Sequence, residues 1–243
     1  MDSDIIGKIK ASGLTGRGGA CFPTGQKWEM VATSPEKERY IVCNASEGDP
    51  HTFKDKYLLE NNLSEIINGI VIAIETIKPK KTYIYLAPHF KDLKANIEKE
   101  IQGKPITIFD KPDDLYPHGE ETVALNAIEG QKLEPRTRPP YPTEMGLWGK
   151  PTLINNVETF YWISQIAKGK YSGEIFVCIY KDGQKPIIAK AKPTDMISQV
   201  LVENNISGDP DTQVGGIAGK KGKLSEVDQT LEKLFCSIYI INR

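Results

Sequence analysis

Near its start the chain carries the segment Gly16-Arg17-Gly18-Gly19-Ala20-Cys21-Phe22-Pro23-Thr24-Gly25-Gln26-Lys27-Trp28. Its first three glycines can adopt a positive φ, so neighbouring backbone N–H groups can converge into a nest that binds an anion. Lys27 can add a mobile positive charge. The glycine spacing matches neither G-x-G-x-x-G nor G-x-x-x-x-G-K-[ST], which argues against an ordinary dinucleotide fold and a P-loop NTPase. The segment therefore predicts a loop that holds the phosphate of a nucleotide or a flavin.

Three further segments follow this glycine loop in order. They are residues 43–50 with 53–55, residues 119–122, and residues 146–152 running into 155–159. With the glycine loop, these segments resemble the NADH-oxidising, FMN-binding subunit of respiratory complex I and of NAD-linked hydrogenases. The resemblance spans roughly residues 12–160. A more distant similarity, to the Rnf-type C subunit, rests on residues 113–118, which lead directly into Gly119.

Composition limits the classes of protein to consider. A chain of 243 residues can form one large domain, or a medium and a small one. The formal net charge of −1 argues against nucleic-acid binding, because no basic block is present to displace the counterions of phosphates. The longest apolar run, residues 66–77, is too short to cross a bilayer, and residues 1–4 show no secretory signal. We therefore expect a cytoplasmic protein with no direct membrane insertion.

The four cysteines, Cys21, Cys43, Cys178 and Cys236, are far apart and form no C-x-x-C pair. In the cytosol they would stay reduced. The subunit that this chain resembles carries a cysteine-rich C-terminal segment that binds a four-iron cluster, and no such segment is present in the sequence. The resemblance therefore implies that the iron–sulfur cluster is not in this chain and belongs to a partner iron–sulfur subunit.

Hydrophobic periodicity predicts the first part of the fold. Residues 40–44, 82–86 and 106–109 have the composition of strands, and residues 64–77 and 90–101 have apolar residues at helical spacing. Ser64 is expected to cap the first of these helices. Alternating strands and helices predict a Rossmann-like α/β sheet, whose ligands bind at the carboxyl ends of the strands.

The remainder of the chain predicts a second, smaller domain. After a proline-rich connector, residues 135–149, and a helical segment from 155 to 169, the pattern changes to hairpin, helix, strand and strand. This order suggests a β-grasp module, and the resembling family has a soluble-ligand-binding-like module at this point. We expect an FMN- and NADH-binding domain at residues 1–170 and the β-grasp domain at residues 171–243.

The resemblance also implies the site residues. The cofactor FMN would contact Gly16, Arg17, Gly18, Lys27, Asn44, Ser46, Glu47, Gly119, Glu120, Glu121, Asn155 and Asn156. The substrate NAD(H) would contact Phe22, Lys27, Asp49, Tyr116, Glu121 and Tyr141. Hydride transfer is the work of the flavin, so no catalytic side chain is expected, with Glu121 as the residue near the reaction.

Simpler interpretations exist for the same residues. The glycines can form an ordinary turn, Phe22 can be a core residue, and the carboxylates of 47–49 and 120–121 can cap helices or face solvent. Asn155 and Asn156 can cap a helix. Two departures from the family pattern lie inside the predicted site. Cys21 replaces a glycine and Ser46 replaces an aspartate.

Two functions remain open from the sequence. The first is an NADH dehydrogenase module of a multi-subunit complex, which takes hydride from NADH onto FMN and passes electrons to a partner iron–sulfur protein. The alternative is a catalytically silent flavin- or nucleotide-binding or assembly module. A third possibility is that the chain is a truncated gene product.

Overall fold

The computed structural model describes residues 4–115, 119–181, 183–216, 219–233 and 237–241. The chain divides into two compact units. Unit 1 comprises Met1–Gly48 and Leu58–Tyr171, and unit 2 comprises Asp49–Tyr57 and Ser172–Arg243. A short segment of the N-terminal half thus belongs to the second unit, which the linear order of the sequence does not suggest.

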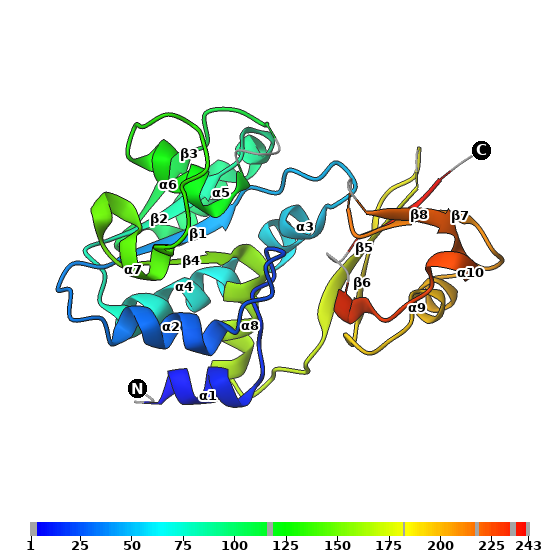
Figure 1. Cartoon of the computed structure of the whole chain (residues 1–243), viewed down its shortest axis with the longest axis horizontal. Helices are drawn as coiled ribbons and strands as arrows, with labels where there is room; N and C mark the ends of the chain where they lie inside the picture. The colour runs from blue at the N-terminus through cyan, green and yellow to red at the C-terminus, as the bar shows by residue number, and fades with distance from the viewer. Residues whose placement is uncertain (1–3, 116–118, 182, 217–218, 234–236, 242–243) are drawn as a thin grey trace. The chain divides into compact units, whose positions relative to one another are not determined.

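Unit 1 contains a parallel sheet of four strands in the order β3-β2-β1-β4 (Figure 1). The strands are β1 (Tyr40–Ala45), β2 (Lys81–Leu86), β3 (Ile106–Asp110) and β4 (Thr152–Asn156). Three of them lie where the sequence predicts strands. The fourth, β4, lies in a segment that we interpreted only as the approach to a helix. Its pairing with β1 places Asn156 opposite Asn44.

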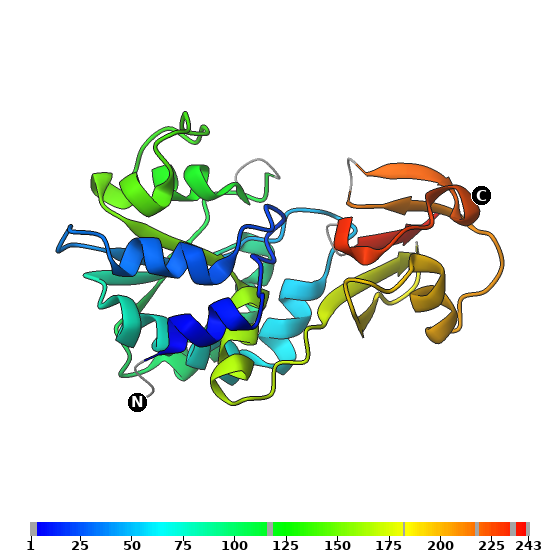
Figure 2. The same cartoon turned by 60° about the horizontal axis from the view of Figure 1, so that its bottom comes forward.

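Helices cover both faces of this sheet. Figures 1 and 2 show α4 and α8 on one face and α6 on the other. The helices of unit 1 are α1 (Ile5–Ala11), α2 (Thr24–Ala32), the end of α3 (Lys54–Asn61), α4 (Leu63–Ile77), α5 (Lys94–Ile101), α6 (Glu121–Ile128), α7 (Pro142–Met145) and α8 (Val157–Ala167), with 3-10 turns η1 (Pro88–Leu93) and η3 (Leu147–Gly149). The chain adds β2 and β3 on one side of β1 and then returns to add β4 on the other side. Because such crossovers are right-handed, the connection from β3 to β4 places α6 on the opposite face of the sheet.

Local differences from the predicted elements have identifiable causes. Helix α4 begins at Leu63 with Asn62 at its N-cap, so the prediction that Ser64 caps it is wrong. Residues 90–101 form the end of a 3-10 turn, which begins at Pro88, followed by α5 from Lys94. The buried run of β1 and the apolar face of α4 follow the predicted patterns.

Unit 2 contains a mixed sheet of five strands in the order β6-β5-β9-β7-β8. Its elements are β5 (Ile175–Lys181), β6 (Ile187–Ala191), α9 (Ile197–Glu203), β7 (Asp211–Val214), β8 (Lys220–Lys223), α10 (Leu224–Val227), η4 (Leu231–Lys233) and β9 (Ser237–Ile240). Strands β5 and β9, the first and last of these strands along the chain, pair in parallel. The pairs β5–β6, β7–β8 and β7–β9 are antiparallel. One face packs on α9 through a core that includes Val177, Val200 and Ile238. The predicted class, a Rossmann-like α/β sheet followed by a β-grasp-like mixed sheet, is confirmed.

No helix in the described part of the chain is long and apolar enough to span a bilayer.

The tightest helix contact of unit 1 joins α4 to α8. A Cβ at Gly69 would overlap the carbonyl oxygen of Phe160 and come 2.7 Å from its carbonyl carbon. Next to this contact, Glu65 Oε2 accepts hydrogen bonds from Ser164 Oγ at 2.6 Å and from Lys168 Nζ at 2.6 Å. The bond from Lys168, and then that from Ser164, lowers the pKa of the Glu65 carboxyl.

We predict that Gly69→Ala destabilises the protein by about 1–3 kcal/mol, because the methyl group forces two helix backbones apart. The direction of the change distinguishes packing from helix propensity. Alanine is the better helix former by about 1 kcal/mol, so propensity alone would stabilise the variant. Thermal unfolding measures the effect. Glu75→Ala, at an exposed position of the same helix, is the control and should change stability by less than about 0.5 kcal/mol. A Gly69→Ala protein as stable as the parent would show that the helices do not pack this closely.

We predict that Glu65→Gln lowers the free energy of unfolding at neutral pH by about 1 kcal/mol. Because the folded pKa lies below the ordinary 4.5, the contribution is complete above pH ~5 and is lost as the pH falls through the folded pKa. Thermal unfolding at decreasing pH from pH 7 should show the difference in stability between the parent and the variant narrowing below pH ~5. A difference that does not narrow in acid would contradict this assignment.

Candidate functional site

The glycine loop is closed by backbone contacts. Gly16 N donates to Phe22 O at 2.8 Å, and Thr24 N donates to Leu14 O at 2.9 Å, just before α2 begins. The N–H of Gly16 is therefore committed within the loop. No residue that the structure describes accepts a hydrogen bond from the N–H of Gly18 or Gly19. These two donors remain available for an anion.

The side chain at position 21 is a local departure. Cys21 is exposed and has a φ of 50°, a conformation that favours glycine. Gly19 in the same loop has a φ of 110°. The loop therefore keeps a backbone shape suited to glycine although one position carries a thiol.

The loop lies against the N-terminus of α8. A Cβ at Gly18 would lie 3.4 Å from Asn156 Cβ, and Arg17 N donates to Thr159 Oγ1 at 3.0 Å. Asn156 caps this helix by accepting from Glu158 N at 3.0 Å, so the capping interpretation of Asn156 is confirmed. The positive end of an 11-residue helix thus stands beside the available N–H groups, an arrangement that favours an anion.

Lys27 connects three elements. It lies near the start of α2, and its Nζ is 3.2 Å from the backbone O of Ile154 in β4 and 3.4 Å from Glu121 Oε2 at the start of α6. The side chain of Lys27 is only 20% exposed. The lysine is therefore held in the site and does not extend into solvent.

Asn44 lies at the carboxyl end of β1. Its Nδ2 donates to Gly119 O at 2.9 Å, which joins the end of β1 to the segment before α6. A Cβ at Gly119 would come 2.9 Å from Ser46 O, so the two backbones approach closely here. Asn44 Oδ1 and Ser46 Oγ are buried and have no hydrogen-bond partner among the described residues. Buried polar atoms rarely lack a hydrogen-bond partner, so these two oxygens are candidates to contact a ligand.

The carboxylates of Glu120 and Glu121, at the start of α6, both contact Arg138 and otherwise have different partners. Glu120 Oε2 accepts from Thr122 N at 2.8 Å and Val123 N at 3.1 Å, so this side chain caps the helix. Glu121 Oε1 lies 3.2 Å from Arg138 NH1, while its other oxygen faces Lys27. Glu121 is thus held between two cations.

Arg138 is a site residue that the sequence reasoning missed. It comes from the proline-rich connector, where no local pattern marks it. The connector is held on α6 by Arg136, whose N donates to Thr122 Oγ1 at 2.9 Å and whose Nε donates to Asn126 Oδ1 at 2.8 Å. Only this tertiary docking brings Arg138 to Glu121.

Three predicted site residues need separate description. With its amide oriented to satisfy both ends, Asn155 accepts from Trp28 Nε1 at 2.9 Å, and the residue is 5% exposed. Its side chain thus braces α2, on the opposite face of β4 from Asn156. Asp49 belongs to unit 2, whereas Glu47 belongs to unit 1. Tyr116 lies outside the described residues.

Two predicted aromatic contacts are open to solvent. Phe22 is 41% exposed and Tyr141 is 52% exposed, so the interpretation of Phe22 as a core residue is wrong. Exposed rings at the rim of a site can stack on a planar ligand.

The site lies at the point where the strand order reverses. Strands β2 and β3 follow on one side of β1, and β4 lies on the other. In open α/β sheets ligands bind outside the carboxyl ends of the strands at such a point. The glycine loop, Lys27, Asn44, Glu121 and Asn156 meet there, within unit 1. The arrangement can hold an anion at one end and a hydrogen-bonding heterocycle near Asn44.

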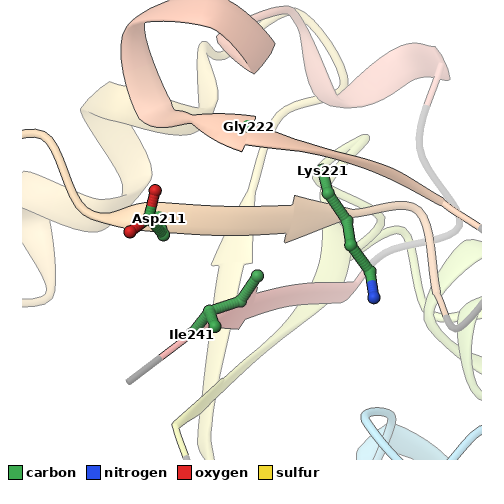
Figure 3. A pocket seen from close by; sticks show the side chains of 4 residues that line it. All are labelled: Asp211, Lys221, Gly222 and Ile241. Carbon is green, nitrogen blue, oxygen red and sulfur yellow. The ribbon is translucent and has the colours of Figure 1, made fainter. Parts of the chain in front are cut away.

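A separate pocket of about 270 Å³ occurs in unit 2 (Figure 3). It is lined by Asp211, Lys221, Gly222 and Ile241, none of which is a predicted site residue. Among the residues with described positions, no group of three or more His, Cys, Asp or Glu side chains could hold a metal ion.

Comparison with known proteins identifies the class to which this fold and site belong. The model of the Nuo51 FMN-binding domain matches residues 9–165, and the chain belongs to this family. The predicted family is thereby confirmed.

Particular relatives agree. The chain is 38% identical to the F subunit of NADH-quinone oxidoreductase from Buchnera aphidicola subsp. Schizaphis graminum, over 64% of this chain and 39% of that protein. It is 34% identical to the F subunit of the same oxidoreductase from Escherichia coli K12, over 70% of this chain and 44% of that protein. The H2-reduced crystal structure of an NAD+-reducing [NiFe]-hydrogenase superposes with a TM-score of 0.89 at 27% identity, over 99% of this chain and 47% of that one. The chain spans less than half of the length of these relatives.

We predict that Gly119→Ala destabilises the protein by about 1–3 kcal/mol, because its methyl group would push the segment before α6 away from Ser46. Gly18→Ala is the matched control. Its methyl group would make only an ordinary contact, and its φ is not positive, so stability should change by less than about 0.5 kcal/mol. Chemical denaturation of both variants checks the pair, and equal effects would refute the close approach at Gly119.

Proposed function

We propose that this chain binds FMN at the carboxyl edge of its parallel sheet and oxidises NADH. The observation that carries the proposal is the convergence of four sequence segments, far apart along the chain, through Lys27, Asn44, Glu121 and Asn156. Membership of the FMN-binding domain family supports the choice of cofactor. The names of the relatives support the choice of NADH.

The residues present fit the two ends of FMN. The phosphate would meet the available N–H groups of Gly18 and Gly19 beside the N-terminus of α8. The flavin ring carries both hydrogen-bond donors and acceptors along one edge. The buried, unpartnered oxygens of Asn44 and Ser46 suit that edge.

When bound, the flavin supplies the acceptor for a hydride from the dinucleotide, and the chain supplies position and charge. Lys27 and Arg138 hold the Glu121 carboxylate in place from two sides. Phe22 and Tyr141 offer exposed ring faces on which the nicotinamide and adenine rings can stack. In this scheme no side chain of the protein forms a covalent bond with the substrate.

The electrons would leave through a partner. We propose that an iron–sulfur subunit of a larger complex accepts them. The relatives are named as a subunit of a quinone oxidoreductase and as a hydrogenase, which supports an electron-transfer assembly. In this proposal residues 1–170, apart from residues 49–57 of unit 2, act as the FMN- and NADH-binding domain and residues 171–243 as the β-grasp domain.

We predict that the purified chain, reconstituted with FMN, retains a flavin absorbance band that bleaches when NADH is added without oxygen. An anaerobic titration with NADH measures this. Retention of flavin without bleaching would support the silent binding module instead. Failure to retain flavin would end both proposals.

The same assay tests the anion site separately from stability. Gly18→Ala should weaken FMN binding by about tenfold or more, because a methyl group would stand where the phosphate must approach the backbone. Since this substitution is expected to leave the fold unstrained, the loss would not follow from unfolding. Equal FMN affinity of parent and variant would place the phosphate elsewhere.

A further inference from the structure

Helix α6 carries a row of polar side chains along one face. Thr122, Asn126 and Glu129 are spaced at helical intervals, which places them on the same side of the helix. Glu129 is the C-cap residue of α6, where the helix dipole disfavours a carboxylate unless a cation stands beside it. That cation is Arg136 of the connector, whose Nη2 lies 2.9 Å from Glu129 Oε2.

The Arg136 guanidinium serves three partners at once. Besides the ion pair with Glu129, its Nε donates to Asn126 Oδ1 at 2.8 Å and its Nη1 donates to Gly146 O at 2.9 Å. A planar guanidinium holds its donors in fixed directions, so it can keep three acceptors in one arrangement. The side chains of Arg136 and Glu129 are only 24% and 14% exposed, so the pair lies mostly out of water.

Glu129 extends this link to the far end of the connector. Its Oε1 accepts a hydrogen bond from Trp148 N at 2.6 Å. Trp148 has a φ of 51°, an uncommon conformation for a bulky residue, and its ring centre lies 4.8 Å from that of Tyr40. Arg136 stands near the start of the connector, and Gly146 and Trp148 stand near its end. The pair of Arg136 with Glu129, here called the clasp, therefore closes the connector into a loop within unit 1.

The closed loop carries two of the side chains that the proposed function uses. Arg138 Nη1 lies 3.2 Å from Glu121 Oε1, and the Tyr141 ring is 52% exposed. The prolines that flank Tyr141 fix φ, so this part of the connector is stiff. A displacement at the base of the loop is therefore transmitted to both side chains.

We propose that the clasp positions Arg138 and Tyr141 for the dinucleotide, with Arg136 and Glu129 as the positioning residues. The role in dinucleotide binding rests on the proposed function. The physical reason is preorganisation, since a loop whose two ends are already tied loses less conformational entropy when a ligand orders it. The clasp thereby acts on substrate affinity, and neither of its members touches the reacting atoms.

The test uses the full chain reconstituted with FMN. Arg136→Gln removes the guanidinium. Glu129→Gln is the milder variant, because its amide oxygen can still accept from Trp148 N. Glu134→Gln is the matched control, since it removes a nearby carboxylate whose ion pair with Lys132, at 2.7 Å, is exposed to solvent.

Hydrogen–deuterium exchange of the amides of residues 137–145 is measured without any ligand, and the KM for NADH, kcat and the Kd for FMN are measured in parallel. We expect Arg136→Gln to speed this exchange and to raise the KM about three- to tenfold. Glu129→Gln should change both quantities in the same direction and by less. The kcat and the Kd for FMN should change less than about twofold in both variants. Glu134→Gln should behave as the parent.

A second comparison separates positioning from a general loss of structure. A chain with Arg138→Gln and Tyr141→Leu lacks the two side chains that the clasp positions. Adding Arg136→Gln to this chain should change the KM less than about twofold, because the effects are coupled. An equal rise of the KM in both backgrounds would overturn the proposal, as would a parallel rise of the Kd for FMN.

The exchange measurement separates this inference from the proposed function. If the parent fails to retain FMN or to bleach, the proposed function fails, and with it the role in dinucleotide binding, while the exchange at residues 137–145 still decides whether the clasp holds the loop. If the parent is active and the exchange does not respond to Arg136→Gln, the clasp fails and the proposed function stands.

Discussion

The parallel pairing of β1 with β4 is the constraint on which the site depends. It sets Asn44 opposite Asn156 at the carboxyl edge of the sheet, although more than a hundred residues separate them. The pairing also sends the chain from β4 directly into α8, whose N-terminus lies against the glycine loop. Without this strand pair the anion-binding end and the heterocycle-binding end of the site would have no common edge.

Several side chains serve the fold and the proposed site together. Asn156 and Glu120 cap helices, and Lys27 binds a strand carbonyl, while all three remain at the carboxyl edge of the sheet. The structural and the functional interpretations of such residues are therefore not exclusive. A helix N-terminus needs a polar cap, and the same unpaired N–H groups attract an anion. Substitutions there will mix stability with binding, so Gly18, where a methyl group would make only an ordinary contact, is the sharper probe.

The chain crosses between the two units three times, after residues 48, 57 and 171. Residues 49–57, from the N-terminal half of the chain, pack their rings on one face of the mixed sheet of unit 2. A sheet with one apolar face on α9 and aromatic side chains on the other needs a cover on both faces.

The sequence by itself predicted the family, three strands of the parallel sheet, a helix over residues 64–77, and the hairpin and helix with which the second module begins. It predicted two strands after that helix, where the structure has β7, β8 and β9. Periodicity and ordered motifs carry this information locally. It did not predict β4. We interpreted these residues as the approach to a helix, because a buried strand of five residues lacks the alternation of apolar and polar residues that marks a half-buried strand. Nor did it identify Arg138, which reaches Glu121 only because Arg136 docks the connector on α6. The tertiary structure alone decided that Asn155 braces Trp28 and that residues 49–57 belong to the second unit. Such assignments depend on contacts between segments that are distant in the sequence, and a local sequence pattern does not show which of these segments come into contact.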